Sequence, residues 1–482
     1  MGTDQRLPRA RRSRAYVLTF LGAIGCVLAI PTVADAQSSD GPATVITDLP
    51  GLTDTERQVA IAVQRIYEAL IDRSGELPPG QEAMFGKLEE LAHTANDLLD
   101  SGNNSRSLQL TAGGLLEALN WVANEETAAK GGLATETAQG QFGNVAARLG
   151  QLRGGAGGLL LGRLEHDAYP AAVGLINHGG AVGGGASSDG LVSPVGAFVN
   201  GYYGIGQRDP TDRENAYDAD YYGLTGGVDL RLTDRLVVGA ATGVSRAEAE
   251  FDRSKSVADG GAEANVVTAS LYGLYDVDRY YLNGIFTVGA VDYRLTRRID
   301  YPSNNPSVDP SDETARASPT GRQMLMGLTG GYQWRFGATN VGGFGRLDYL
   351  RVQIDDYRET GAGPFNLRVG EQRIESLRST LGVEANRVFD MDFGILQPGL
   401  RVEWHHEFEN NSRDVDMGFV SDPTNTRFTA PTDSPDRDFF TVAASAAAVF
   451  PGGLQSFAEI ATIIGLEDVS STQITVGIRG EF

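Results

Sequence analysis

The last twelve residues, Ser471–Phe482, read Ser-Thr-Gln-Ile-Thr-Val-Gly-Ile-Arg-Gly-Glu-Phe. Apolar side chains occupy alternate positions, at Ile474, Val476, Ile478 and Phe482, and most of the residues between them are polar. Alternation over this length predicts a β-strand with one apolar and one polar face. A transmembrane barrel strand, with one face toward lipid and the other toward a polar lumen, explains both the pattern and the final aromatic residue.

The same period of two recurs through residues 191–482, in runs such as 222–231, 323–336, 396–408 and 440–450. The pattern is less regular at 341–357, where we expect the apolar positions to change parity at a β-bulge. Short turns alternate with longer polar loops, which fall near 208–218, 254–262, 300–320, 359–366 and 411–437.

Alternating short and long connections are typical of outer-membrane barrels, in which the turns are periplasmic and the loops lie outside. Counting the segments predicts an antiparallel β-barrel of about twelve strands over residues 191–482. The acidic loop residues match no Ca²⁺-binding template, so we expect a solvated acidic surface there.

The first residues resemble a secretory signal. Five arginines lie between Arg6 and Arg14, an apolar run covers 16–30, and Ala34-Asp35-Ala36 has the small-x-small form of a cleavage site. This pattern predicts a signal peptide over residues 1–36, with cleavage between Ala36 and Gln37. The one cysteine, Cys26, lies inside the apolar run, and lipid attachment there is the alternative.

Residues 37–153 show helical spacing and are predicted to form an α-helical module. Thr53 and Glu56 fit a capping box, and apolar residues recur every three or four positions up to about residue 153. The simplest interpretation is a small helical bundle whose apolar stripes form its core. Residues 154–190 are rich in glycine and are predicted to be a flexible linker before the barrel.

Composition excludes some classes of function. The chain has 482 residues and a net charge of −22, whereas a nucleic-acid-binding domain would carry a basic patch or stripe. The mean hydropathy is −0.20. Beyond the N-terminal segment, no apolar run approaches the roughly 20 residues that a membrane helix needs.

Several short stretches, taken in their order and spacing, resemble the β-domain of autotransporters, the type V secretion family. The resemblance covers roughly residues 190–482 and is carried by Tyr221–Asp229, Leu271–Gly273, Glu359–Gly361, Glu375–Ser379, Glu403–Phe408 and Val476–Phe482. It implies a monomeric twelve-stranded barrel in the outer membrane of a Gram-negative bacterium, surrounded by outer-membrane lipid. It also implies a lumenal helix that leads to an N-terminal passenger at the cell surface.

The resemblance further identifies the last strand, with Ile474, Val476, Ile478 and Phe482, as an assembly signal. The implied partners are the barrel-assembly machinery and periplasmic chaperones. Two features depart from the family pattern. The passenger is short and helical, and the one Asn-Asn pair ahead of the barrel, Asn103-Asn104, lies far from the first strand, so passenger cleavage is not carried over. We favour residues 139–153 as the lumenal helix, with 159–167 as the alternative.

No catalytic, cofactor-binding or metal-binding residues are predicted. The sequence contains no G-x-S-x-G and no H-E-x-x-H motif. Arg401, Glu403, His405 and Glu407 share one parity and are predicted to face the lumen as a polar network. A barrel-embedded hydrolase with His405 as base and a nearby serine as nucleophile is the alternative.

Taken together, the sequence predicts an outer-membrane autotransporter, not an enzyme, that displays a short helical module. A passive outer-membrane pore, plugged or tethered by a periplasmic helical segment, is the second hypothesis.

Overall fold

The computed structural model describes residues 46–123, 129–153 and 195–481, apart from 252, 410, 452 and 453. All of them belong to one compact unit, Thr44–Phe482. The predicted signal peptide with its Ala36–Gln37 cleavage site, the linker 154–190 with the alternative lumenal helix, and Phe482 lie outside the described residues. Within them, no helix is both long enough and apolar enough to cross a membrane.

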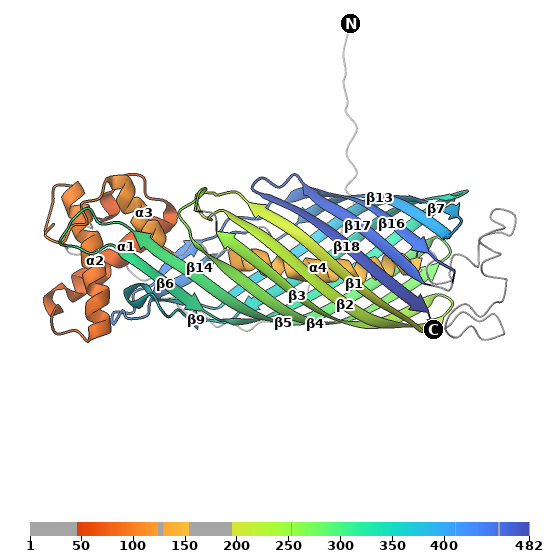
Figure 1. Ribbon diagram of the computed structural model, residues 1–482, viewed down its shortest axis with the longest axis horizontal. Coiled ribbons are helices and arrows are strands. Elements are labelled where there is room, and N and C mark those ends of the chain that lie inside the picture. The colour runs from red at the N-terminus through yellow and green to blue at the C-terminus, as the bar shows by residue number, and fades with distance from the viewer. Residues whose placement is uncertain are drawn as a thin grey trace, which may run out of the picture. The chain divides into compact units, whose positions relative to one another are not determined.

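The described residues form a closed antiparallel barrel of twelve strands, as the sequence predicted (Figure 1). Each strand pairs with its neighbours along the chain, and β1 pairs with β18 to close the ring. The strands are β1 Val195–Arg208, β2 Tyr217–Thr233, β3 Leu236–Phe251, β4 Gly260–Val277, β5 Tyr280–Tyr301, β7 Thr320–Phe336, β8 Thr339–Ile354, β11 Gln372–Arg387, β13 Gly394–Glu407, β16 Asp438–Val449, β17 Gln455–Ile464 and β18 Val469–Glu481. The short strand β12, Phe389–Met391, extends the turn between β11 and β13.

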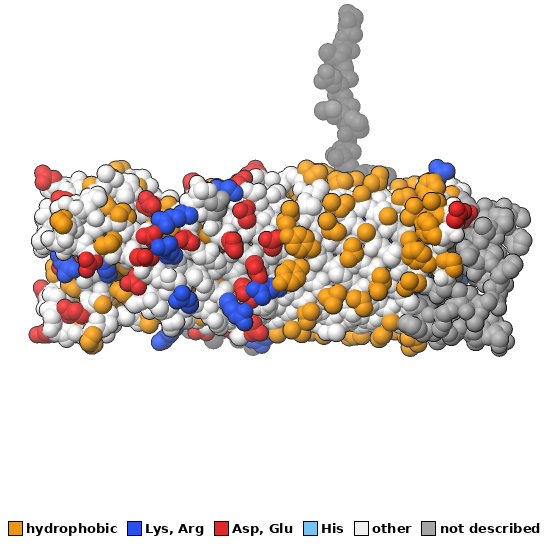
Figure 2. Space-filling view, in the orientation of Figure 1, with side chains coloured by type: hydrophobic (Ala, Val, Ile, Leu, Met, Phe, Trp, Pro, Cys, Tyr) orange, Lys and Arg blue, Asp and Glu red, His pale blue; other side chains and the backbone are white. Residues whose placement is uncertain are grey.

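The outer surface of the barrel carries an apolar band beside the short turns. Figure 2 shows hydrophobic side chains gathered over this part of the barrel, with charged side chains over the part nearer the long loops. On β5, Leu282, Phe286 and Val288 are exposed in the band, whereas Arg294 is exposed beyond it. About ten tilted residues per strand span a bilayer, so the longer strands project past the band at the loop end.

The expected β-bulge at 341–357 is wrong. β8 pairs with β7 and with β11 in unbroken register from Thr339 to Ile354. The apolar residues change sides because the lumen changes character along its length. Leu347 faces outward in the apolar band, whereas Val352 and Ile354 are buried inside the barrel at the loop end, in a core with Tyr293.

The helical module forms three helices at the loop end of the barrel (Figure 1). α1 is Asp54–Leu70, α2 is Pro79–Leu98 and α3 is Ala112–Ala123, with short 3-10 helices η1 Ile46–Asp48 and η2 Ile71–Arg73. The predicted capping box is confirmed, because Glu56 N–H donates to Thr53 Oγ1 and Thr53 N–H donates to Glu56 Oε2. Pro79, which lacks an N–H group, opens α2 at a position where none is needed.

The long loops predicted near 300–320, 359–366 and 411–437 are more structured than expected. β6 Ser311–Ala317 pairs with the end of β5. A separate four-stranded sheet has the order β15-β14-β10-β9, from β9 Tyr357–Arg358, β10 Leu367–Val369, β14 Asp414–Phe419 and β15 Phe428–Pro431. These runs are too short to recognise by period, and their apolar residues are buried by the module instead of by lipid. The 3-10 helix η5, Gly363–Phe365, lies between β9 and β10.

Candidate functional site: the barrel lumen

In the part of the chain that the structure describes, a long helix, α4 Ala129–Arg153, runs through the lumen (Figure 1). It includes the predicted segment 139–153 and begins earlier, at Ala129. The helix packs against β1–β5, β7 and β8. Its buried apolar residues, among them Phe142, Val145 and Leu149, belong to the core inside the barrel.

Polar contacts fix the middle of α4 to the first two strands. Asn144 Nδ2 donates to Thr225 Oγ1 at 2.8 Å, and Thr225 Oγ1 donates to Gln141 Oε1 at 2.8 Å. Asn200 Nδ2 donates to the carbonyl of Asn144 at 2.9 Å. The approach is close at Gly140, where an added Cβ would lie 2.4 Å from the Tyr202 ring. A larger residue there would push the helix off the wall.

Two arginines secure the C-terminal part of α4. Arg148 forms a buried ion pair with Asp229 of β2, and Asp229 also accepts from Tyr272 Oη at 3.3 Å. Arg153 lies over the Tyr281 ring, 3.9 Å from its centroid, and its Nη1 is 3.4 Å from Glu384 Oε1. Each contact joins the helix to a wall strand, so α4 is held at several points along the lumen.

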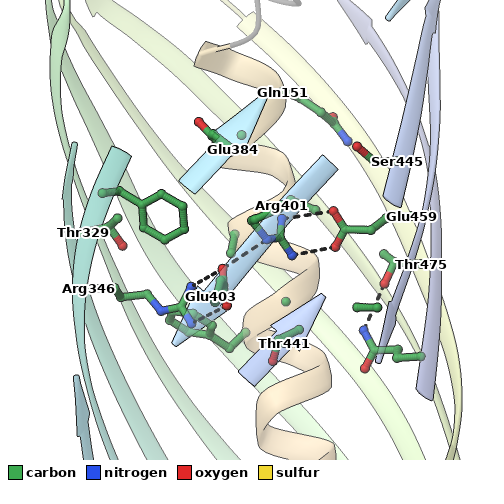
Figure 3. A pocket seen from close by; sticks show the side chains of 18 of the residues that line it. Gln151, Thr329, Arg346, Glu384, Arg401, Glu403, Thr441, Ser445, Glu459 and Thr475 are labelled. Carbon is green, nitrogen blue, oxygen red and sulfur yellow. Dashed lines mark hydrogen bonds and ion pairs between the residues drawn. The ribbon is translucent and has the colours of Figure 1, made fainter. Parts of the chain in front are cut away.

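The opposite side of the lumen is not filled by the helix. A cavity of about 370 Å³ lies between α4 and the wall that includes β11, β13, β16, β17 and β18. Figure 3 shows charged side chains directed into it and bonded to one another. Arg401 donates to both carboxylate oxygens of Glu459 at 3.0 and 2.9 Å and lies 3.1 Å from Glu403. Arg346 reaches Glu403 at 3.4 Å.

His405 is buried in the same wall. Its Nδ1 lies 3.0 Å from Thr380 Oγ1, and its Nε2 lies 2.9 Å from Thr441 Oγ1. The ring stacks on Phe439 with centroids 4.6 Å apart. Glu403 Oε2 lies 3.4 Å from Nε2. Among the described residues, the ring contacts two threonine hydroxyls and not the serine that the hydrolase alternative requires. The geometry is that of a polar network within the wall.

The remaining predicted residues lie elsewhere on the barrel. Glu407 is buried near the loop end, where it accepts from Ser376 Oγ at 2.6 Å and from the Leu377 N–H at 2.9 Å. Ile474, Val476 and Ile478 face outward from β18 in the apolar band. Their role in assembly stays a prediction. Among the described residues, no group of three or more His, Cys, Asp or Glu side chains is placed to hold a metal.

Two buried ion pairs escaped the sequence analysis, Arg148–Asp229 and Arg297–Glu359. Each joins residues far apart in the chain, and no spacing rule connects them. For the first pair, the sequence offered only two separate hints: Asp229 has the lumenal parity of β2, and Arg148 lies on the preceding helix.

Comparisons with known proteins agree on the barrel. The family model described as the autotransporter beta-domain matches residues 197–461. Among curated proteins, the esterase EstA of Pseudomonas aeruginosa is 27% identical over 244 residues, which cover 47% of this chain and 34% of the esterase. An extracellular serine protease of Serratia marcescens is 24% identical over 215 residues, which cover 44% of this chain and 19% of the protease. The matches thus span about a third or less of these relatives.

Solved structures with a similar barrel include the translocator domain of the autotransporter NalP from Neisseria meningitidis. It has a TM-score of 0.46 and 16% identity, over 60% of this chain and 89% of that one. The β-domain of the Bordetella autotransporter BrkA has a TM-score of 0.43 and 15% identity, over 60% of this chain and 100% of that one.

Proposed function

The chain belongs to the autotransporter β-domain family, and on this premise we propose that its barrel carries the helical module, residues 46–123, to the cell surface and anchors it there. The β-domain is a translocator of the Gram-negative outer membrane. The chain is therefore an outer-membrane autotransporter, and the proposal concerns its cargo.

The course of α4 through the lumen carries the proposal. Near its start, Gly132 lies against Tyr217, at the loop end of β2. Near its end, Arg148 and Arg153 contact residues close to the short turns, where β1 also begins. Within the described residues, α4 therefore runs from the loop end of the barrel to the end where β1 begins. Because loops lie outside and turns are periplasmic in such barrels, this course supports a module on the outer side.

The lumen gives little support to a passive pore. α4 fills one side, and a core of buried apolar residues, including Tyr293, Val352 and Ile354, occupies the loop end. Water and ions cross packed apolar layers poorly because their hydration is lost there. A cavity of about 370 Å³ remains beside α4.

Cysteine labelling on intact cells tests the proposal. In a Cys26→Ser background, Ser105→Cys places a thiol on the exposed surface of the module, and Asp234→Cys places one in a short turn. A membrane-impermeant maleimide should label position 105 on intact cells and position 234 only after permeabilisation. Labelling of position 105 that also requires permeabilisation would place the module in the periplasm and favour the tethered pore.

A further inference from the structure

The module and the barrel loops share a single hydrophobic core. Buried residues of all three helices, among them Ile66, Leu88 and Trp121, form one cluster with buried loop residues. The loop members come from β5, β6, η5, the four-stranded sheet and their connections: Ile299, Tyr301, Val308, Ala315, Tyr357, Ala362, Phe365, Leu367, Val369, Val415, Met417, Phe419, Phe428 and Ala430. Neither part can bury these side chains without the other.

Backbone groups of the module are bonded directly to the loop after β5. Asn304 N–H donates to the carbonyl of Leu108 at 2.9 Å, and Asn304 Nδ2 donates to that of Gln109 at 3.0 Å. Asn305 Nδ2 donates to the carbonyl of Ser107 at 2.8 Å. Gln109 has a φ of 54°, a left-handed conformation that a residue with a Cβ rarely adopts. The two asparagines therefore hold this segment in a shape that is unfavourable without them.

A buried arginine of the barrel, paired with a loop carboxylate, donates a hydrogen bond to the end of α3. Arg297 of β5 is 4% exposed and Glu359 is 6% exposed. The guanidinium reaches Glu359 at 2.6 and 3.2 Å and donates to the carbonyls of Phe365 and Trp121 at 3.0 Å each. The Trp121 carbonyl lies in the last turn of α3, where such groups lack partners within the helix. One barrel side chain thus joins a loop carboxylate, η5 and α3.

From these contacts we infer that the barrel loops form a permanent binding site for the module, which we call the seat. We also infer that Arg297 is the residue that holds the module there, a role that we call the lock. The module remains bound to the barrel without its covalent connection to α4. This inference rests on the proposed function for its location at the cell surface, and on the shared core for the attachment itself. The exported segment is thus a fixed cap on its barrel, not a cargo for release.

The test cuts the chain between module and lumenal helix. A recognition sequence for a site-specific protease is inserted between Ala123 and Ala129 of the full-length protein. Protease is added to intact cells, the cells are washed, and fragment 46–123 is measured in pellet and supernatant. The same cut is made on purified protein in detergent, followed by size-exclusion chromatography. We expect the fragment to stay in the pellet and to elute with the barrel.

Variants show whether the lock is Arg297. Arg297→Gln removes the charged donor to the Trp121 carbonyl and leaves Glu359 buried without a counter-charge while the module is bound. It should therefore speed dissociation of the cut fragment by about a hundredfold or more. Arg294→Gln is the matched control, because Arg294 lies on the same strand but faces outward and pairs with Glu263. Asn304→Ala removes only the side-chain hydrogen bond to the Gln109 carbonyl and should speed dissociation less. Heat-modifiable migration checks that each barrel is folded.

The outcomes separate the two proposals. Release of the fragment from cells or from purified barrel overturns the seat, and equal dissociation of the Arg297 and Arg294 variants overturns the lock. A site that is cut only in lysed cells overturns surface display. In that case co-elution after cutting the purified protein still supports the seat, and separation still contradicts it.

Discussion

Arg148 of the lumenal helix and Asp229 of β2 form an ion pair that is almost fully buried, with side-chain exposures of 0% and 5%. Tyr272 adds a third group, because its hydroxyl donates to the same carboxylate. A charge in this position is stable only while its partner is present. The pair therefore ties the position of α4 to the barrel wall.

Asp229→Asn should destabilise the protein by about 3–5 kcal/mol, because it leaves the Arg148 guanidinium buried without a counter-charge. Urea unfolding of the refolded protein in detergent measures the change. Glu384→Gln is the control. It breaks the Arg153–Glu384 ion pair, which is less buried than the Arg148–Asp229 pair, and should cost less than about 1 kcal/mol. Equal losses in the two variants would show that α4 is not held by Arg148.

Removal of α4 should open the lumen. A chain that begins at residue 190 lacks the helix, whereas one that begins at residue 129 retains it. A twelve-stranded barrel has room for about one helix, so α4 obstructs the lumen of the longer chain. We therefore expect the shorter chain to conduct ions much better in planar bilayers. Equal conductance of the two refolded chains would mean that α4 does not obstruct the barrel.

A charge on the lipid-facing side of the last strand should block assembly. Ile478 is 57% exposed in the apolar band, and an aspartate there costs up to about 2 kcal/mol in lipid. Ile478→Asp, or deletion of Phe482, should reduce heat-modifiable protein in the outer membrane. Gln473→Asp places the same charge on the cavity side of β18 and should assemble normally. Normal assembly of the Ile478 variant would contradict the assigned role of this strand.

Two lumenal arginines should differ in their effect on stability. Arg401 bonds both oxygens of Glu459. The Arg378 side chain makes no hydrogen bond or ion pair among the described residues and lies over the Phe439 ring at 5.7 Å. Arg401→Gln should lower the free energy of unfolding by about 1.5–3 kcal/mol, the typical worth of hydrogen bonds to charged groups. Arg378→Gln should change it by less than about 1 kcal/mol. Thermal unfolding of both variants in one detergent checks the order.

Acid should loosen the module through His93. The Arg106 N–H donates to His93 Nδ1 at 3.1 Å, so the ring proton lies on Nε2, which faces Tyr67 Oη at 3.1 Å. Burial, and then the charge of Arg106, lowers the pKa of His93 below its ordinary value of 6.5. Glu89, 3.9 Å from Nε2, is the nearest carboxylate.

Because the folded imidazole stays neutral, only the unfolded chain gains a proton as the pH falls below about 6.5. Stability of the module should then fall by up to about 1.4 kcal/mol per pH unit until the pH reaches the folded pKa. Amide exchange in α2 at pH 7.5 and pH 5 measures this loss. His93→Gln should be less stable at pH 7.5 but less dependent on pH. Equal pH dependence in both proteins would remove His93 as its cause.

The sequence alone determined the barrel, because burial of alternate residues imposes a period of two that survives without knowledge of neighbours. Leu224 and Val228 on β2, and Ile474 and Val476 on β18, face outward as their parity requires. The capping box at Thr53 and Glu56 was also predictable, because its partners are three residues apart. These features depend on local geometry, which a stretch of sequence contains in full.

Only the tertiary structure decided what the barrel holds and what covers its loops. The apolar parity of β8 changes because buried apolar side chains from several strands fill the lumen around Val352 and Ile354. The sequence of β8 alone does not contain that information. Arg297 reaches the Trp121 carbonyl only because the chain folds back across 176 residues. Such contacts follow from the folded arrangement of distant segments, and no local period records them, so the seat of the module could not be read from the sequence.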